Sequence, residues 1–218
     1  MDKSTVVTEK KKGTLREYAE AIVIAVLLAL FIRGFVVQAF KIPSGSMKTT
    51  LLIGDHILVN KFVYGIKIPF WNKEVAHFGE PKRGDIIVFR YPLDSSKDFI
   101  KRVIGVPGDV VRIENKKVFV NDKLLEEPYV QHVNPEILPA NVSPRDNMAA
   151  VQVPQNSFFV MGDNRDESYD SRFWRFVDIG ALKGKAFIIY WSWNGNGRLT
   201  LDPQQGFVRW NRIGSLLH

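Results

Sequence analysis

Hydrophobic residues follow two different patterns along this 218-residue chain. Residues 21–32 form an uncharged apolar run, which predicts a helix. After Phe35, short runs rich in Val, Ile, Phe and Tyr alternate with turn residues, which is typical of strands. The runs cover residues 57–59, 86–91, 99–106, 110–114, 117–120, 158–161 and 186–191. The pattern therefore predicts a mainly β chain with one N-terminal helix.

Turn residues separate the strand-like runs. Gly-Asp pairs at residues 54–55, 84–85 and 108–109 each precede a run, as expected where a turn leads into a strand. Asn115-Lys116 and Asn121-Asp122 lie between consecutive runs and predict tight hairpins, so we expect antiparallel pairing. Residues 122–156 are rich in proline and show no clear periodicity. We interpret them as a surface excursion of the same domain.

The N-terminal helix is a candidate membrane anchor. Its twelve apolar residues span about 18 Å, whereas an extension from Leu15 to Val37 gives about 34 Å and places charges only near its ends. A basic excess before the helix would keep the N-terminus in the cytoplasm. We therefore expect a cytoplasmic segment (residues 1–17), a transmembrane anchor (18–37) and an extracytoplasmic β-rich domain (38–218). A cleaved secretory signal and a buried amphipathic helix are the alternatives.

Composition narrows the chemistry without deciding it. Lys and Arg number 30 against 23 Asp and Glu, and the net charge of +7 suits nucleic acid, anionic lipid or neither. No helix-turn-helix pattern appears, so we expect no nucleic-acid partner. The chain has no cysteine, which excludes disulfides, thiolate zinc sites and a cysteine nucleophile.

Hydroxyl groups and a lysine are the candidate catalytic groups. The sequence PSGSM at residues 43–47 offers Ser44 and Ser46, and a serine nucleophile needs a neighbouring base. Strand alternation places Lys101 on the same face as Phe99 and Val103. Burial there would lower the pKa of the amine from about 10.4 to about 8, which suits a base. The alternative is that Lys101 is a solvated strand charge, like its neighbour Arg102.

Other sources of catalysis are weaker. His56 is the histidine closest in sequence to Ser46, but it opens a strand-like run; a Ser/His pair stays an alternative because such pairs are spatial. The polar stretch GDNRDESYDSR, residues 162–172, contains several carboxylates. It lacks the spacing of a calcium loop, so we expect no metal and no other cofactor.

The sequence thus contains three clusters: PSGSM at residues 43–47, the strand around Lys101, and the polar stretch 162–172. Taken together and in this order, they resemble those of the type I signal peptidases, membrane-bound serine proteases that remove signal peptides from exported proteins. The match runs from about Arg33 to Gly184, through FKIPSGSM, GDHILVNKF, RGDIIVF, DFIKRVIGVPGD and VMGDNRDESYDSRFW. Two positions depart from the family pattern: Thr49 stands where proline is usual, and Arg175 stands where glycine is usual. The resemblance implies an N-terminal transmembrane helix followed by an antiparallel β-rich catalytic domain of the signal-peptidase type.

The resemblance also implies a role for each site residue. Ser46 would attack the scissile carbonyl, and Lys101 would accept its proton, as a Ser/Lys dyad. Ser44 and the Ser46 backbone N–H would face the oxyanion, and Ser168 would orient the lysine amine. A supporting ion pair would join Asp170 to Arg172. The implied substrate-binding residues, which would line small apolar pockets for Ala-x-Ala-like signal-peptide ends, are Phe40, Ile42, Pro43, Met47 and Ile100.

The implied partners are preprotein signal peptides and the phospholipid membrane. The expected location is the cytoplasmic membrane, crossed once, with the catalytic domain on the periplasmic side. One alternative function is a membrane-tethered β-rich binding module without catalysis. Another is a self-cleaving repressor with Ser/Lys chemistry, but residues 1–33 leave no room for the DNA-binding domain that it would normally carry.

Overall fold

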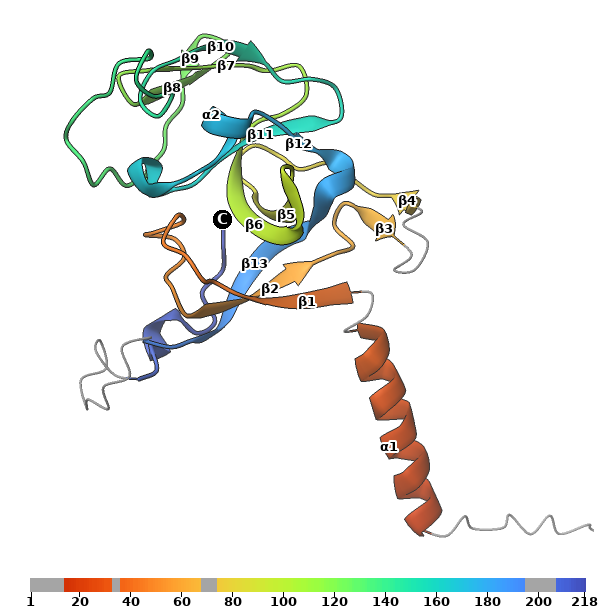
Figure 1. The fold of residues 1–218 in the computed structure, drawn as a ribbon. Coiled ribbons are helices and arrows are strands. Elements are labelled where there is room, and N and C mark those ends of the chain that lie inside the picture. Colours follow the sequence, from red (N-terminus) through yellow and green to blue (C-terminus); the bar gives the residue numbers. More distant parts are fainter. Residues whose placement is uncertain (1–13, 33–35, 68–73, 195–206) are drawn as a thin grey trace, which may run out of the picture.

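The computed structural model describes residues 14–32, 36–67, 74–194 and 207–218 (Figure 1). A long helix, α1 (Thr14–Phe31), precedes a body built almost entirely from strands. The strands are β1 (Val37–Lys41), β2 (Asp55–Asn60), β3 (Gly65–Lys67), β4 (Glu74–His77), β5 (Ile86–Tyr91), β6 (Asp94–Gly105), β7 (Val110–Glu114), β8 (Lys117–Val120), β9 (Lys123–Leu124), β10 (Met148–Gln152), β11 (Ser157–Met161), β12 (Val177–Asp178) and β13 (Leu182–Ser192). This architecture confirms the predicted mainly β fold.

A seven-stranded sheet forms the larger part of the body. Its order is β1-β2-β13-β5-β6-β11-β12, and every neighbouring pair is antiparallel. Strand β6 lies between β5 and β11, so both of its edges are paired along the segment that carries Lys101. Strand β1 lies at one border of the sheet and pairs only with β2 among the described strands.

A second sheet of four strands, in the order β10-β7-β8-β9, covers one side of the body (Figure 1). The hairpins β7-β8 and β8-β9 turn through Asn115-Lys116 and Asn121-Asp122, whose φ angles are all positive, from 49° to 68°. Consecutive positive φ values match the right-handed twist of a hairpin, so the predicted tight turns are confirmed. The predicted excursion, residues 122–156, supplies β9 and β10 to this sheet.

The predicted Gly-Asp turns are also present. Gly54, Gly84 and Gly108 have φ angles of 86° to 94°, a left-handed conformation that a side chain disfavours. Each of these turns leads toward a strand: β2, β5 and β7 respectively. These three glycines therefore stand where the backbone adopts a positive φ angle just before a strand of one of the two sheets.

Three apolar clusters hold the body together, and the first lies beneath the candidate nucleophile. It combines Ile42, Met47 and Leu51 from the loop after β1 with buried residues of β2, β5 and β13. The second cluster packs β5, β6, β11 and β12 residues around Phe89 and Trp174. The third cluster joins the four-stranded sheet to β6 and β11. Packing on both sides of β6 thus fixes the strand that carries Lys101.

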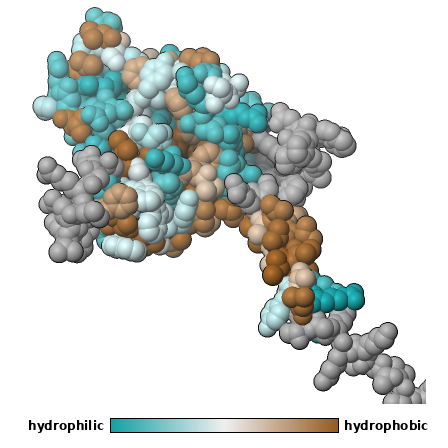
Figure 2. Space-filling model, turned by 60° about the horizontal axis from the view of Figure 1, so that its bottom comes forward, coloured by the Kyte–Doolittle hydropathy of each residue, from teal (hydrophilic) through white to brown (hydrophobic). Residues whose placement is uncertain are grey.

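Helix α1 extends away from the body and exposes its side chains along its length (Figures 1 and 2). The helix spans residues 14–31, and Val37, the last residue of the expected anchor (18–37), pairs with Asn60 in the sheet. Among the helices of the described residues, none has both the length and the apolar content needed to cross a bilayer.

Candidate active site

Ser46 lies in the loop that connects β1 to β2. Both ends of this loop are pinned, since Ile42 N–H donates to Asp55 O at 2.8 Å and Gly54 N–H donates to Ile42 O at 3.0 Å. Met47 and Leu51 are completely buried, and Leu51 N–H donates to Met47 O at 2.7 Å. Burial of these two apolar side chains fixes the turn and leaves Ser46 at its edge, 8% exposed.

The structure brings Lys101 into contact with Ser46. Lys101 Nζ lies 2.6 Å from Ser46 Oγ, although 55 positions separate the two residues in sequence. Its side chain is 4% exposed, and Nζ lies 5.4 Å from the centre of the Phe99 ring on the same face of β6. The alternative of a solvated strand charge is therefore wrong for Lys101, and also for Arg102, which is 2% exposed.

Burial lowers the pKa of Lys101 to about 8, because an ammonium group loses hydration in this position. The buried pair of Asp170 and Arg172 acts in opposite directions on this pKa: the carboxylate raises it and the guanidinium lowers it. Because the effects of these two charges on the Lys101 pKa oppose each other, desolvation remains the main cause of the lowered pKa. The amine is available as a base at mildly alkaline pH.

The predicted ion pair between Asp170 and Arg172 is present in the structure, fully buried. Arg172 Nε and Nη2 each donate to the Asp170 carboxylate at 2.8 Å, and Gly162 N–H donates to it at 3.0 Å. Burial alone would raise the pKa of Asp170, but Arg172 and these hydrogen bonds hold it below its usual value. Asp170 also caps the short helix α2 (Ser171–Trp174) by accepting from Arg172 N–H.

The other charged residues of the loop 162–172 bind different parts of the chain. Asp163 pairs with Arg102 at 2.8 Å, and its carboxylate also accepts from Thr50 Oγ1 at 2.5 Å. Arg165 pairs with Glu127. Asp166 accepts from Lys116 Nζ at 2.9 Å. The loop is therefore tied to β6, to the turn that follows Ser46, and to the region that carries the second sheet.

Gly162 allows this loop to approach the nucleophile. A Cβ atom at this position would lie 2.3 Å from Ser168 Oγ and 2.4 Å from Ser46 O, distances too short for any side chain. Ser168 is 5% exposed. No hydrogen bond joins its hydroxyl to Lys101 among the described contacts, so its role in orienting the lysine stays a prediction.

The remaining predicted residues lie around the same loop. Ser44 and Pro43 are exposed beside Ser46. Phe40 and Ile100 are half-buried and pack against the cluster that contains Ile42 and Met47. Four of the five predicted pocket residues thus share one apolar cluster next to the Ser46–Lys101 contact, and the fifth, Pro43, follows Ile42 directly.

Three residues that the sequence did not single out belong to the site. Arg102 and Asp163 form the buried pair described above, and Asn164 donates from its backbone N–H to Ser46 O at 3.1 Å. Asp163 and Asn164 fall within the polar stretch that the sequence did identify. Their partners are more than 60 positions away in sequence, so no local pattern could reveal them.

The alternative base, His56, is engaged elsewhere. Its Nε2 lies 2.8 Å from Trp193 Nε1, which donates to it, and its pKa is lowered by burial and by Lys41. No hydrogen bond connects a histidine to Ser46 within the described ranges. Those same ranges contain no group of three or more His, Asp or Glu residues able to hold a metal ion.

The positions that depart from the family pattern also have a structural setting. Arg175 ends α2 with φ of 77°, a conformation that favours glycine and costs an arginine about 1 kcal/mol. Thr49 is exposed in the turn after Ser46. Neither departure removes a contact between Ser46, Lys101 and the loop 162–172.

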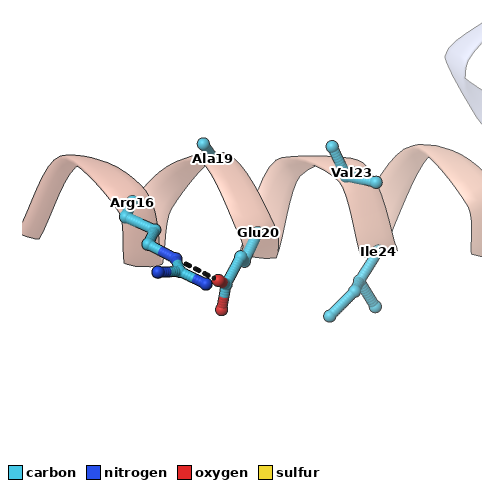
Figure 3. Close-up of a pocket in the computed structure, with 5 residues that line it drawn as sticks. All are labelled: Arg16, Ala19, Glu20, Val23 and Ile24. Atoms are coloured by element: carbon cyan, nitrogen blue, oxygen red, sulfur yellow. Dashed lines mark hydrogen bonds and ion pairs between the residues drawn. The ribbon is translucent and has the colours of Figure 1, made fainter. Parts of the chain in front are cut away.

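A shallow hollow lies on α1, away from Ser46. Its lining residues are Arg16, Ala19, Glu20, Val23 and Ile24, and Figure 3 shows the Arg16–Glu20 ion pair, 2.8 Å long, among them. Both charged groups are largely exposed and neutralise each other. The hollow contains no hydroxyl nucleophile, and its one carboxylate, Glu20, is paired with Arg16, so the Ser46–Lys101 contact is the better candidate for catalysis.

Comparison with known proteins identifies the family of this chain. The family model described as signal peptidase, peptidase S26, matches residues 15–191. The signal peptidase I of Pseudomonas fluorescens is 40% identical over an alignment of 220 positions, and the match covers 86% of this chain and 77% of that protein. A probable signal peptidase I-2 of Synechocystis is 38% identical and covers 92% of this chain and 87% of its own length.

Among solved structures, the crystal structure of a signal peptidase I from Enterococcus faecalis is 29% identical, with a TM-score of 0.40, and covers 49% of this chain and 97% of its own. The family assignment rests on the family model and the sequence relatives. The chain therefore belongs to the signal peptidase I family, peptidase S26, a family of serine peptidases that remove signal peptides.

Proposed function

We propose that this protein is a membrane-attached serine endopeptidase that removes N-terminal signal peptides after small residues, using a Ser46/Lys101 dyad. One observation carries the proposal: the buried amine of Lys101 lies 2.6 Å from the Ser46 hydroxyl oxygen. A lowered amine pKa of about 8 supports the base role, since the neutral form becomes available at mildly alkaline pH.

In the proposed reaction, neutral Lys101 accepts the hydroxyl proton while Ser46 Oγ bonds to the scissile carbonyl carbon. The C–N bond then breaks, and Lys101 returns the proton to the leaving amine. An acyl-enzyme remains on Ser46. Water attacks this ester with Lys101 again as base, and the Ser46 hydroxyl is regenerated.

Two groups are proposed to stabilise the oxyanion. They are the Ser46 backbone N–H and the Ser44 hydroxyl. Ser44 is exposed on the same loop, and no hydrogen bond occupies either group among the described contacts, which leaves both available to a substrate. Ser168 is proposed to orient Lys101, and the pair of Asp170 and Arg172 to support both.

The substrate is proposed to bind as an extended segment beside β1. This strand lies at the border of the sheet and leads directly into the loop of Ser46. An added strand would make main-chain hydrogen bonds and place alternate side chains into the surface. Small side chains are proposed to enter shallow pockets lined by Phe40, Ile42, Pro43, Met47 and Ile100, four of which share one apolar cluster.

Membrane attachment is proposed to use α1 and an apolar surface of the body at the opposite end of β1. Helix α1 exposes Ile22, Leu27 and other apolar side chains to more than half of their area. On the body, Ile53 and Trp210 are exposed, and Arg209, which precedes Trp210 in the chain, donates to Ile53 O at 2.7 Å. In the proposed orientation, residues 1–17 are cytoplasmic and residues 38–218 lie on the outer side of the cytoplasmic membrane.

The proposal is tested by incubating the full chain, in detergent, with a synthetic preprotein whose signal ends in Ala-x-Ala. Mass determination of the products is expected to place the cut after the second alanine. A matched preprotein with phenylalanine in place of that alanine is expected to be cut at least ~10-fold more slowly, because a shallow pocket rejects the ring. Cleavage at other positions, or none, would contradict the proposal.

The rate is expected to depend on pH through Lys101. Since only the neutral amine acts as base, kcat/KM should rise about tenfold per pH unit below about 8 and level off above it. Single-turnover rates between pH 6 and 10 check this, with a substrate that has no titrating group near the cut. A flat profile, with chemistry rate-limiting, would remove the lysine from the mechanism.

A further inference from the structure

Asn164 holds the main chain on both sides of the Ser46 α-carbon. Its backbone N–H donates to Ser46 O at 3.1 Å, and its side-chain Nδ2 donates to Gly45 O at 3.1 Å. Asn164 is completely buried and comes from a loop 119 positions away from Gly45 in sequence. Neither contact is needed for the dyad contact itself, which joins Lys101 directly to the Ser46 hydroxyl.

The surroundings of the Asn164 amide decide which atom donates. Nδ2 also donates to Glu167 Oε2 at 2.8 Å. Gly45 O and the Glu167 carboxylate are both acceptors, so a flipped amide would bring three oxygens together. The Asn164 Oδ1 atom is left buried without a partner among the described residues, an unfavourable arrangement. Both amide hydrogens are therefore directed at Glu167 and at the carbonyl before the nucleophile.

The Gly45 carbonyl and the Ser46 N–H belong to one peptide unit. This unit is planar and trans, so its N–H points opposite to its C=O. A donor that fixes the direction of Gly45 O therefore also fixes the direction of the Ser46 N–H. A hydrogen bond to the carbonyl polarises the unit and strengthens its N–H as a donor. Lys48 N–H also donates to Gly45 O at 3.1 Å, so the local turn shares this task.

We propose that Asn164, steadied by Glu167, aims the Ser46 backbone N–H at the oxyanion that develops on the scissile carbonyl. Asn164 is a positioning residue, because it touches no reacting atom and acts through the peptide unit between Gly45 and Ser46. This inference rests on the proposed function, in which that N–H is an oxyanion donor. Within the loop 162–172, Asn164 would thus stabilise the oxyanion of the transition state, and it would leave the pKa of Lys101 unchanged.

The main test replaces Asn164 by leucine, which has a similar volume and removes both side-chain hydrogen bonds but keeps the backbone contact to Ser46. Loss of a complete oxyanion donor lowers kcat about 10²- to 10³-fold, and Lys48 still holds Gly45 O. We therefore expect kcat of Asn164→Leu to fall about 10- to 100-fold, with KM changed less than about threefold. The midpoint of the pH profile should not move, since Lys101 keeps its surroundings.

A matched control is Asn147, which also bridges two backbone groups. Its Nδ2 donates to Leu138 O at 2.9 Å, and its Oδ1 accepts from Asn115 N–H at 2.9 Å. Asn147→Leu should leave kcat unchanged, even where it lowers the melting temperature as much as Asn164→Leu does. An equal fall of kcat in both variants would reduce Asn164 to a residue of general stability and overturn the inference.

Two further variants keep the inference testable if Asn164→Leu folds poorly. Glu167 is exposed, so Glu167→Ala should fold normally. It should also free the Asn164 side-chain amide from its carboxylate acceptor and lower kcat about threefold.

A double-mutant cycle is the second test. Ser44→Ala and Asn164→Leu act on the same oxyanion, so the combined fall in kcat should differ from the product of the single falls. A multiplicative result, or an unchanged kcat in Glu167→Ala, would contradict the positioning role. If Ser44→Ala alone leaves kcat unchanged, the Ser44 part of the oxyanion assignment fails instead, and Asn164→Leu and Glu167→Ala still test the Ser46 N–H.

Discussion

Replacing Lys101 by methionine is expected to lower preprotein cleavage about 10³-fold or more and, at the same time, to raise the free energy of unfolding at pH 7. The loss of activity follows because no other base contacts Ser46 Oγ among the described residues. Methionine has nearly the same length as lysine, so the packing against Phe99 can be kept. Cleavage assays at equal protein concentration measure the first effect, and urea unfolding measures the second.

The stability gain follows from the sign of the pKa shift. Folding lowers the pKa of Lys101 from 10.5 to about 8, so the folded state disfavours the proton at neutral pH. A difference of about 2.5 in pKa corresponds to about 3.4 kcal/mol, offset in part by the lost hydrogen bond to Ser46. A net gain of about 2 kcal/mol is expected at pH 7. For the unsubstituted chain, stability from this group rises between pH 8 and 10.5, and the methionine variant should lack that rise.

The exposed Lys117 of β8 provides the control. Lys117→Met should leave both activity and the pH dependence of unfolding within experimental error of the unsubstituted chain. A Lys101→Met variant that is less stable at pH 7 would mean that the ammonium group contributes favourably to the fold, which contradicts desolvation as the main influence on this site.

Replacing Ser46 by alanine should abolish cleavage, with a fall of about 10⁴-fold or more, because the acyl-enzyme can no longer form. Only one hydroxyl is removed from a residue that is 8% exposed, so the melting temperature should change little. Mass spectrometry of a slowly turned-over substrate should show the acyl adduct on the unsubstituted chain and not on the variant.

Ser95→Ala is a suitable companion variant, since Ser95 is an exposed serine of β6. It should cleave the preprotein at the unsubstituted rate. Full cleavage by Ser46→Ala would place the nucleophile on another residue and end the dyad proposal, whatever the Lys101 variant does.

The strands could be predicted because their information is local. Alternation and turn chemistry are read within a few residues, and β5, β7 and β8 have the predicted bounds. The order of the seven-stranded sheet could not be read this way. Strand β13 inserts between β2 and β5, a pairing that depends on apolar side chains far apart in sequence.

The site was predictable in composition but not in geometry. Alternation along β6 indicated that Lys101 shares a face with Phe99, yet only the family resemblance paired the amine with Ser46. Arg102 had the same local pattern as a surface charge, and its burial depends on Asp163, 61 positions away. Sequence periodicity reports which face a residue occupies, whereas burial of a charge depends on a partner that another segment supplies.

The ties of the loop 162–172 have a consequence for the conditions in which the enzyme can work. Small exported proteins often hold a rigid loop with disulfides, which makes their shape depend on the oxidising or reducing character of the compartment. Here the same loop is held by Arg102, Glu127 and Lys116, and the chain has no sulfhydryl group at all. The geometry around Ser46 is therefore indifferent to thiols and disulfide-exchange catalysts in its surroundings.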